Sequence, residues 1–265
     1  MGNKDLETVS KQDALKEYDV KQYETPAGYT SDIAVFTIDS KQARSQEQEL
    51  KLMLIRRALL NGEGKPNIEG GKWALPGGFI QPNESAYEGA VRELSEETTI
   101  NNVHVKHFGV YDTSGRDPRG WIISNAHYAI VPMKYIELRK AADDAMEVEI
   151  FNMEEVFRLQ LAFDHEVIIR DALHQVQEDM MQTTLAKDFL PNEFTLSELW
   201  HVVVSVAGER AIESYPNFHR KAKNLSFIEE VKDDCGEVKR QKRFAKQPTK
   251  LYRFTNEHVK KSIYK

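Results

Sequence analysis

Apolar positions in the first 160 residues form short extended runs and one helical run. Ile33 to Ile38 and Leu50 to Ile55 are almost wholly apolar, which predicts strands and favours the centre of a sheet for the first. Further strands are predicted over residues 73–80, 103–111, 126–132 and 147–151, a helix over 83–97, and a polar accessory helix over 5–22. Strands and helices that mix without a regular alternation predict an α+β domain.

Beyond residue 160 the spacing becomes mainly helical. A long helix is predicted over 165–185, a second over 195–206 and a short basic third over 214–224, followed by strands near 227–232 and 250–254. Thr195 and Glu198 form a capping-box pattern at the start of the second helix, and Gly208 is placed to end it. This order is typical of a winged helix-turn-helix. The sequence therefore predicts two domains, residues 1–160 and 161–265.

Charge is divided unequally between these two regions. The chain has 265 residues and a net charge of −6, from 42 acidic and 36 basic side chains. Residues 215–265 carry a net charge of +8, which leaves −14 on residues 1–214. An acidic first part joined to a basic last part indicates two units with different partners.

Composition excludes several classes of protein. No apolar run approaches the roughly 20 residues needed to cross a bilayer. Residues 1–20 are charged throughout and lack the apolar core of a signal peptide. Cys235 is the single cysteine, so an internal disulfide is excluded and a reducing cytoplasm is expected.

The run from Val238 to Arg253 contains seven basic residues and no acidic one. Such a run is compatible with a solvated tail. Aromatic and aliphatic residues interrupt it, among them Phe244, Leu251 and Tyr252, and this favours a folded hairpin.

Three glutamates lie on one side of the helix predicted over 83–97. Helical geometry predicts a buried stripe of Tyr87, Ala90, Val91 and Leu94. The acids beside that stripe are Glu93, Glu96 and Glu97, and Gly89 opens space next to them. Like charges at this spacing repel one another, and a hard divalent cation, Mg²⁺ or Mn²⁺, would relieve the repulsion. The chemistry that matches such a cation site is metal-assisted attack of water on a phosphoanhydride. The alternative is that the three acids form a solvated acidic helix face.

The segment that contains this helix resembles the Nudix box. The matching positions are Gly78, Glu84, Arg92, Glu93, Leu94, Glu96, Glu97 and Ile100. The resemblance implies the Nudix α/β/α sandwich with a mixed sheet. It also implies a metal ion held by Glu93, Glu96 and Glu97, carboxylates oriented by Arg92, and support from Glu84. Thr99 departs from the pattern, because the family has glycine there. A β-branched residue resists a positive φ, so an altered helix end is expected.

Arginines in two other segments are candidates for binding phosphate. Arg116 and Arg119 flank Asp117 and Pro118 on a turn, where paired guanidinium groups suit phosphate or ribose. An Arg–Asp clamp within the loop is the alternative. The segment resembles the RDPRG loop of ADP-ribose-type Nudix proteins. Arg56 and Arg57, at the end of a strand, are candidates for the pyrophosphate, with ordinary surface arginines as the alternative.

Two further roles remain open at the level of sequence. Glu147 and Glu149 follow a turn, and in related Nudix hydrolases a glutamate in this region acts as general base, for which Glu147 is favoured here. Trp73 and Tyr111 could stack on a base, although buried aromatic residues of the core are the commoner outcome.

Four segments after residue 160 resemble the Nudix-related transcriptional regulators of NAD metabolism. These segments are LAFDH (161–165), PNEFTLSEL (191–199), NFHRKAKNL (217–225) and KLYRF (250–254). In that family a Nudix domain that senses ADP-ribose or a related nucleotide is fused to a winged helix that binds double-stranded DNA, and many members are homodimers. The candidate DNA-binding residues are Arg220, Lys221 and Lys223 on the third helix and Lys239, Arg240, Lys242 and Arg243 on the wing.

Three functional hypotheses follow. The leading one is a DNA-binding regulator that responds to an ADP-ribose-like metabolite and retains the acids needed for hydrolysis. The second is a plain Mg²⁺-dependent ADP-ribose pyrophosphatase whose basic domain serves assembly or protein interaction. The third, a hydrolase of damaged nucleotides, leaves the basic domain and the RDPRG segment unexplained.

Overall fold

The computed structural model describes most of the chain. The described ranges are residues 24–38, 49–98, 100–101, 103–133, 147–208, 214–222, 224–243 and 247–257, with residues 12, 16, 18, 19, 21, 212 and 259. The accessory helix predicted over 5–22 therefore lies largely outside the described residues, as do Thr99 and Lys223. In the described part of the chain, no helix is long and apolar enough to span a membrane.

A mixed seven-stranded sheet forms the centre of the first domain. Its strands are β1 (Gly28–Ile38), β2 (Leu50–Arg56), β3 (Trp73–Ala74), β4 (Gly77–Phe79), β5 (Val105–Tyr111), β6 (Ile122–Ile130) and β7 (Val148–Asn152). The order is β3-β2-β1-β6-β5, while β4 also pairs with β1 and β7 with β2. Strands β1 and β6 are parallel, and the other pairs are antiparallel.

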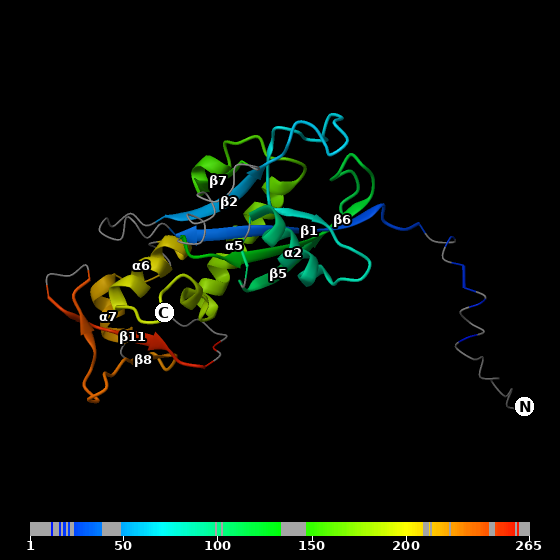
Figure 1. Ribbon diagram of the computed structural model, residues 1–265. Helices are drawn as coiled ribbons and strands as arrows, with labels where there is room; N and C mark the ends of the chain where they lie inside the picture. Colours follow the sequence, from blue (N-terminus) through cyan, green and yellow to red (C-terminus); the bar gives the residue numbers. More distant parts are fainter. Residues whose placement is uncertain are drawn as a thin grey trace, which may run out of the picture.

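Strand β1 is buried on both faces, and its alternate residues enter two separate cores. Ile33 and Val35 pack in one cluster with residues of α2 (Ala86–Thr98). Ala34 and Phe36 pack in the other with residues of α5 (His165–Gln182). Because side chains alternate along a strand, this places one helix on each side of the sheet, as Figure 1 shows. The α/β/α sandwich expected from the sequence is confirmed.

The buried face of α2 differs in part from the predicted stripe. Ala90 and Leu94 are fully buried, but Tyr87 is 46% exposed, so its prediction as a core residue was wrong. The first turn of the helix contacts β1 through Ala86, whose carbonyl oxygen accepts a hydrogen bond from Ser31 Oγ at 3.2 Å, while the side chain of Tyr87 turns toward solvent. Gly89 also makes room for the preceding loop, since a Cβ there would lie 3.2 Å from Glu84 Oε1, while the space that it was expected to open for a ligand stays a prediction.

The second domain has the predicted helix order. A single turn, α4 (Met153–Val156), precedes α5, and η3 (Leu185–Asp188), α6 (Leu196–Ala207) and α7 (Tyr215–Ala222) follow it. The capping box of α6 is confirmed, since Glu198 N donates to Thr195 Oγ1 at 3.2 Å and Thr195 N to Glu198 Oε2 at 2.7 Å. Gly208 ends the helix with a φ of 86°.

Two short antiparallel pairs follow the helices. The strands are β8 (Ile228–Glu230), β9 (Arg240–Gln241), β10 (Thr249–Lys250) and β11 (Tyr252–Phe254), paired as β9 with β10 and β8 with β11. The basic run 238–253 therefore begins and ends in paired strands. This confirms the predicted folded hairpin and argues against the alternative, a solvated tail.

Helix α5 connects the two parts of the molecule. Its buried residues, which include Ile168 and Ile169, belong to one cluster together with Phe36 of β1 and Leu199 and Val203 of α6. In Figure 1 the helix lies between the sheet and the C-terminal helices. The boundary near residue 160 stays a prediction, and the structure places α5 in contact with both sides.

Candidate functional site

Arg92 gathers the acidic residues of the box. Its guanidinium donates to both oxygens of Glu84, at 3.0 and 2.5 Å, to Glu93 Oε1 at 2.7 Å and to Glu96 Oε2 at 3.1 Å. A further bond reaches the carbonyl oxygen of Phe79 at 3.1 Å. These hydrogen bonds from Arg92 lower the pKa of Glu84 to about 2. Arg92 therefore holds these carboxylates in place, as the resemblance implied.

Glu97 lies deeper than its neighbours, beside the Gly77–Gly78 turn. Burial raises its pKa to about 8, and the negative charges of Glu93 and Asp32 act in the same direction. The backbone N–H of Gly77 donates to Glu97 Oε2 at 2.7 Å and partly offsets this. At Gly78 a Cβ would lie 2.4 Å from Glu93 Oε1, so glycine is needed for the carboxylate to approach the turn.

This donor set fits a divalent cation, although the cation site is not assembled. Among the described residues, no group of three His, Cys, Asp or Glu side chains converges closely enough to hold a metal ion. The guanidinium of Arg92 lies between Glu93 and Glu96, and its positive charge balances their negative charges. The carboxylates of Glu93 and Glu97 repel each other beside a turn without side chains, and a cation would reverse this unfavourable contact. The metal role of Glu93, Glu96 and Glu97 stays a prediction.

A small polar cavity of about 70 Å³ lies on the other side of the same turn. Its walls come from β1, the Gly77–Gly78 turn, the loop 113–121 and the segment that leads into α5. The lining residues are Thr30, Asp32, Arg57, Leu75, Gly77, Gly78, Phe79, Arg116, Asp117, Arg119, Phe163 and His165. Three arginines and two aspartates line this cavity, and we call Arg57, Arg116 and Arg119 the arginine cluster.

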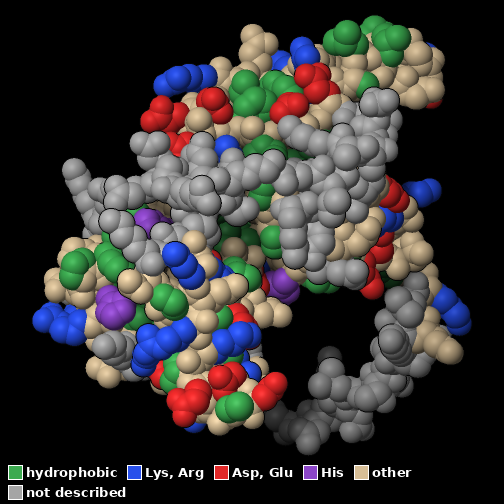
Figure 2. Space-filling view, turned by 60° about the vertical axis from the view of Figure 1, so that its left-hand side comes forward, with side chains coloured by type: hydrophobic (Ala, Val, Ile, Leu, Met, Phe, Trp, Pro, Cys, Tyr) green, Lys and Arg blue, Asp and Glu red, His purple; other side chains and the backbone are tan. Residues whose placement is uncertain are grey.

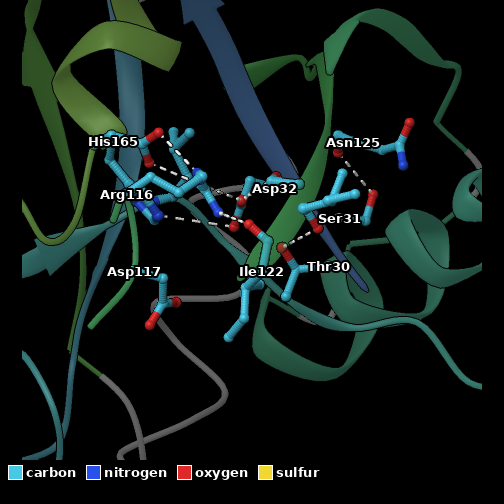
Figure 3. Close-up of polar contacts among 12 residues, drawn as sticks. Thr30, Ser31, Asp32, Arg116, Asp117, Ile122, Asn125 and His165 are labelled. Atoms are coloured by element: carbon cyan, nitrogen blue, oxygen red, sulfur yellow. Dashed lines mark hydrogen bonds and ion pairs between the residues drawn. The ribbon is translucent and has the colours of Figure 1, made fainter. Parts of the chain in front are cut away.

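Arg116 is the most deeply buried member of the arginine cluster. Its side chain is 5% exposed, and it donates to both oxygens of Asp164, at 2.8 and 2.6 Å. Arg116 also donates to the carbonyl oxygen of Ile122 at 3.4 Å and lies 4.0 Å from Asp32 Oδ2. Figure 3 shows Asp32, Arg116 and His165 pointing toward one another, while Asp117 turns away.

Arg119 lies between two aromatic rings. It forms a two-bond pair with Asp117, at 3.0 and 2.6 Å, which is the clamp considered from the sequence. Its Cζ is 5.0 Å from the ring centre of Phe79 and 5.2 Å from that of Phe163. Arg57 lies 5.0 Å from the Phe163 ring, and burial, followed by repulsion from Arg119, lowers its pKa. An anion in the cavity would relieve this repulsion.

Other predicted residues lie outside the cavity lining. Arg56 Nη1 donates to Glu147 Oε2 at 2.9 Å in an exposed ion pair, so the predicted general base and a predicted phosphate ligand contact each other. Trp73 packs edge-on against Phe151, with ring centres 4.9 Å apart, which is the core outcome. Tyr111 Oη donates to Asp171 of α5 at 2.7 Å. The roles of Arg56 and Glu147 stay predictions.

Two polar residues of this site were missed from the sequence. Asp32 is 7% exposed and accepts a hydrogen bond from Ser124 Oγ, and His165 is 4% exposed. The signal for Asp32 was an acidic residue at the start of an otherwise apolar strand. His165 is the last residue of the LAFDH segment, which resembles a segment of the Nudix-related regulators, but the sequence assigned no role to this histidine.

The candidate DNA-binding side chains fall into two groups. Arg220, Lys221, Arg240 and Lys242 are exposed. Lys239 Nζ instead donates to Glu193, at 2.8 and 2.7 Å, and Arg243 Nη1 donates to Glu198 at 2.9 Å. Figure 2 shows Lys and Arg side chains on the lower part of the molecule, beside a smaller acidic group. The two paired residues therefore fasten the wing to α6 and the loop before it.

Comparison with protein families gives two matches along the chain. The NUDIX domain matches residues 30–172, and the NrtR DNA-binding winged helix domain matches residues 186–254. Both parts of the sequence-based assignment, the Nudix box and the fused winged helix, are thereby confirmed.

Individual relatives agree with this division. An ADPR responsive transcriptional repressor NtrR from Acinetobacter baylyi is 28% identical over 247 residues, which cover 92% of this chain and 88% of the relative. An ADP-ribose pyrophosphatase from Methanocaldococcus jannaschii is 42% identical over 125 residues, which cover 47% of this chain and 67% of the relative.

A solved structure agrees in fold over both domains. Shewanella oneidensis NrtR, crystallised with a 27mer DNA, gives a TM-score of 0.67 at 23% identity, over 86% of this chain and 93% of that one. This likeness concerns the fold. Because the first match covers more than half of the sequence, the chain belongs to the NUDIX domain family and continues into a winged helix of the NrtR type.

Proposed function

We propose that this protein is a DNA-binding transcriptional regulator that responds to ADP-ribose or a closely related nucleoside diphosphate. The observation that carries the proposal is the fusion of a NUDIX domain, with an arginine cluster that lines a cavity, to an NrtR-type winged helix. The relative from Acinetobacter baylyi, described as an ADPR responsive repressor, aligns over 92% of the chain, so the similarity includes both domains and their connection.

The arginine cluster is the proposed site for the diphosphate. Guanidinium groups pair with phosphate oxygens through two parallel hydrogen bonds, and Arg57 and Arg119 already repel each other in the structure. The cavity of about 70 Å³ is smaller than a nucleotide, since ligand sites usually measure roughly 300–1,000 Å³. Binding therefore requires side chains such as Arg119 to leave the cavity.

Glu93, Glu96 and Glu97 are the proposed ligands of Mg²⁺ or Mn²⁺. When bound, such a cation would polarise a diphosphate oxygen and lower the pKa of a water molecule. In this chain Arg92 holds Glu93 and Glu96 on one side, and the Gly77 N–H holds Glu97 on the other. Glu147, if it acts as general base, must first leave its ion pair with Arg56.

The winged helix is the proposed reader of double-stranded DNA. Arg220, Lys221 and Lys223 are proposed for the major groove, and Arg240 and Lys242 for the phosphates. Lys239 and Arg243, which pair with Glu193 and Glu198, are proposed to position the wing as well as to contact DNA. We also propose a homodimer, because two half-sites need two readers, and activity in the cytoplasm.

A second candidate function is hydrolysis of ADP-ribose. The specific observation in its favour is the set of carboxylates of the box, complete in sequence and fixed by Arg92. The Methanocaldococcus jannaschii relative is described as an ADP-ribose pyrophosphatase and aligns with 47% of the chain. Regulation and hydrolysis are compatible in one protein.

A paired assay tests both functions. Binding of the full chain to the DNA upstream of its own gene is measured by gel shift, with and without ADP-ribose, and ADP-ribose hydrolysis is measured with Mg²⁺. The regulator requires DNA binding that changes with ADP-ribose, and loses support if the DNA is not bound or the nucleotide has no effect. The hydrolase requires turnover that Glu97→Gln abolishes.

A further inference from the structure

His165, the first residue of α5, lines the cavity together with the arginine cluster, and Asp164 precedes it in the chain. Asp164 is the N-cap of the helix and accepts the two hydrogen bonds of Arg116, at 2.8 and 2.6 Å. His165 Nδ1 accepts the backbone N–H of Leu75 at 2.9 Å, so the other ring nitrogen carries the proton. That nitrogen, Nε2, lies 3.8 Å from Asp32 Oδ1. The start of α5 is thus bound to β1, the Gly77 turn and the RDPRG loop.

An anion that enters this cavity competes directly with Asp164. Arg116 is 5% exposed, and its side-chain Nε and Nη2 both donate to that carboxylate. A diphosphate oxygen beside Arg57 and Arg119 offers Arg116 a second acceptor of the same charge and geometry. Because the cavity holds only about 70 Å³, the ligand cannot be added without moving the groups around it. Arg116 is one of these lining groups, and Asp164 is the carboxylate that holds it.

The rest of α5 is fixed to both domains. Near its C-terminal end, the buried Asp179 accepts hydrogen bonds from Tyr128 Oη and Lys106 Nζ, both at 2.5 Å. Its apolar face shares one core with α6. A packed helix moves as a unit because an interior at native density does not deform continuously. A change at the start of α5 therefore reaches the winged helix through the same body.

We propose that Asp164 and His165 are positioning residues through which α5 reads the occupancy of the nucleotide site. This inference rests on the proposed function and adds its route of regulation. Without ligand, Asp164 holds Arg116 and fixes the start of α5. With ADP-ribose bound, Arg116 turns to the diphosphate, Asp164 is released, and the start of α5 repositions α6.

Asp164→Asn tests this inference, with Asp171→Asn as its matched control. Asp171 lies on the same helix and accepts one hydrogen bond from Tyr111, outside the cavity lining. DNA affinity of the full-length chain is measured by fluorescence anisotropy, with and without ADP-ribose. In the wild type and in Asp171→Asn we expect ADP-ribose to change DNA affinity about tenfold or more. In Asp164→Asn without nucleotide, we expect the DNA affinity of the ADP-ribose-loaded wild type, and less than about a twofold further change when ADP-ribose is added.

Each outcome separates this inference from the function on which it rests. If the wild type binds no DNA or ignores ADP-ribose, the proposed function itself fails. If the wild type responds and Asp164→Asn responds equally, the inference is overturned while the function stands. Hydrogen exchange on the wild type needs no variant: ADP-ribose should speed exchange of amides in residues 165–169 more than in 176–182. Unchanged exchange at 165–169 also overturns the inference.

Discussion

The two domains use charged side chains in opposite ways. Around the cavity of the NUDIX domain, arginines are paired with aspartates and largely removed from solvent, as in Arg116 with Asp164 and Arg119 with Asp117. In the winged helix Arg220, Arg240 and Lys242 are exposed to solvent. Removing one partner of a buried pair destabilises the fold, because the other charge is left buried without its partner. Exposed charges add little to stability, but they attract a partner of opposite charge. The first arrangement suits recognition of a small anion, and the second suits a polyanion.

Replacing one arginine in each domain tests this contrast most strongly. Arg116→Ala leaves the buried Asp32 and the partly buried Asp164 without their cation, so we expect the free energy of unfolding to fall by about 3–5 kcal/mol. Arg220→Ala removes an exposed side chain of the same kind, and we expect a change within about 0.5 kcal/mol. Urea unfolding measures both. Equal effects would contradict the distinction between the two regions.

The acidic residues of α2 make a second prediction, which concerns pH. Glu97 has a pKa of about 8 in the folded protein, against an ordinary value of about 4.3. Between these values the folded state keeps a proton that the unfolded state has lost, so the free energy of unfolding falls as pH rises from 5 to 8. Discounted for partial exposure of the side chain, the fall is about 2 kcal/mol.

Glu97→Gln should remove this part of the slope, because the amide is neutral throughout. Unfolding in urea at pH 5 to 9, with a chelator present, provides the measurement. Glu88→Gln is the matched control on the same helix: hydrogen bonds from Ser85 lower the pKa of Glu88, which therefore stays ionised over this range. An unchanged slope in Glu97→Gln would mean that Glu97 does not hold the proton.

Much of this architecture was predictable because it follows from local patterns. Ile33 to Ile38 is apolar except for Thr37, and the structure buries both of its faces. Thr195 and Glu198 predicted their own hydrogen bonds, since a capping box involves residues three positions apart. Tyr87 was misassigned because helical periodicity does not show which residue of the first turn contacts the sheet, and here that residue is Ala86.

The cavity was less predictable because its parts meet only through the fold. Asp32 lies on β1 and Ser124 on β6, and the parallel pairing of these strands places Asp32 opposite Ala126. Asp164 reaches Arg116 only because α5 packs against that side of the sheet. No spacing in the sequence records such a contact. The arginines were identified from their residue type and their loop, and the clamp with Asp117 was considered beside them, whereas Asp32 and Asp164 were assigned only from the structure.

On the winged helix, the contrast predicts an effect on DNA binding without an effect on stability. Arg240→Ala combined with Lys242→Ala removes two exposed charges, and we expect DNA affinity to fall about tenfold at low salt. The slope of log affinity against log salt should decrease by about two. Titrations at several salt concentrations measure both. Lys239→Ala is the comparison variant, since pairing with Glu193 already occupies Lys239, and its effect should be smaller. If Lys239→Ala weakened DNA binding more than the double variant, the DNA would have to bind to another face of the winged helix.

The smallest predicted difference compares two helix caps, one in each domain. Ser85 and Glu88 exchange hydrogen bonds at the start of α2, at 2.8 and 3.2 Å, as Thr195 and Glu198 do at the start of α6. Ser85→Ala should cost about 0.5 kcal/mol, because water can replace the lost bond at an exposed cap.

Thr195→Ala should cost about 1–2 kcal/mol, near the upper end for a cap, because Thr195 is only 5% exposed and water cannot replace the lost bond. Glu198 also accepts from Arg243 of the wing, so loosening this cap weakens the attachment of the wing to α6. Urea unfolding gives the stability difference, and DNA titration shows whether wing attachment matters. A Thr195→Ala protein with lowered stability and unchanged DNA affinity would mean that the wing is positioned by its own strands.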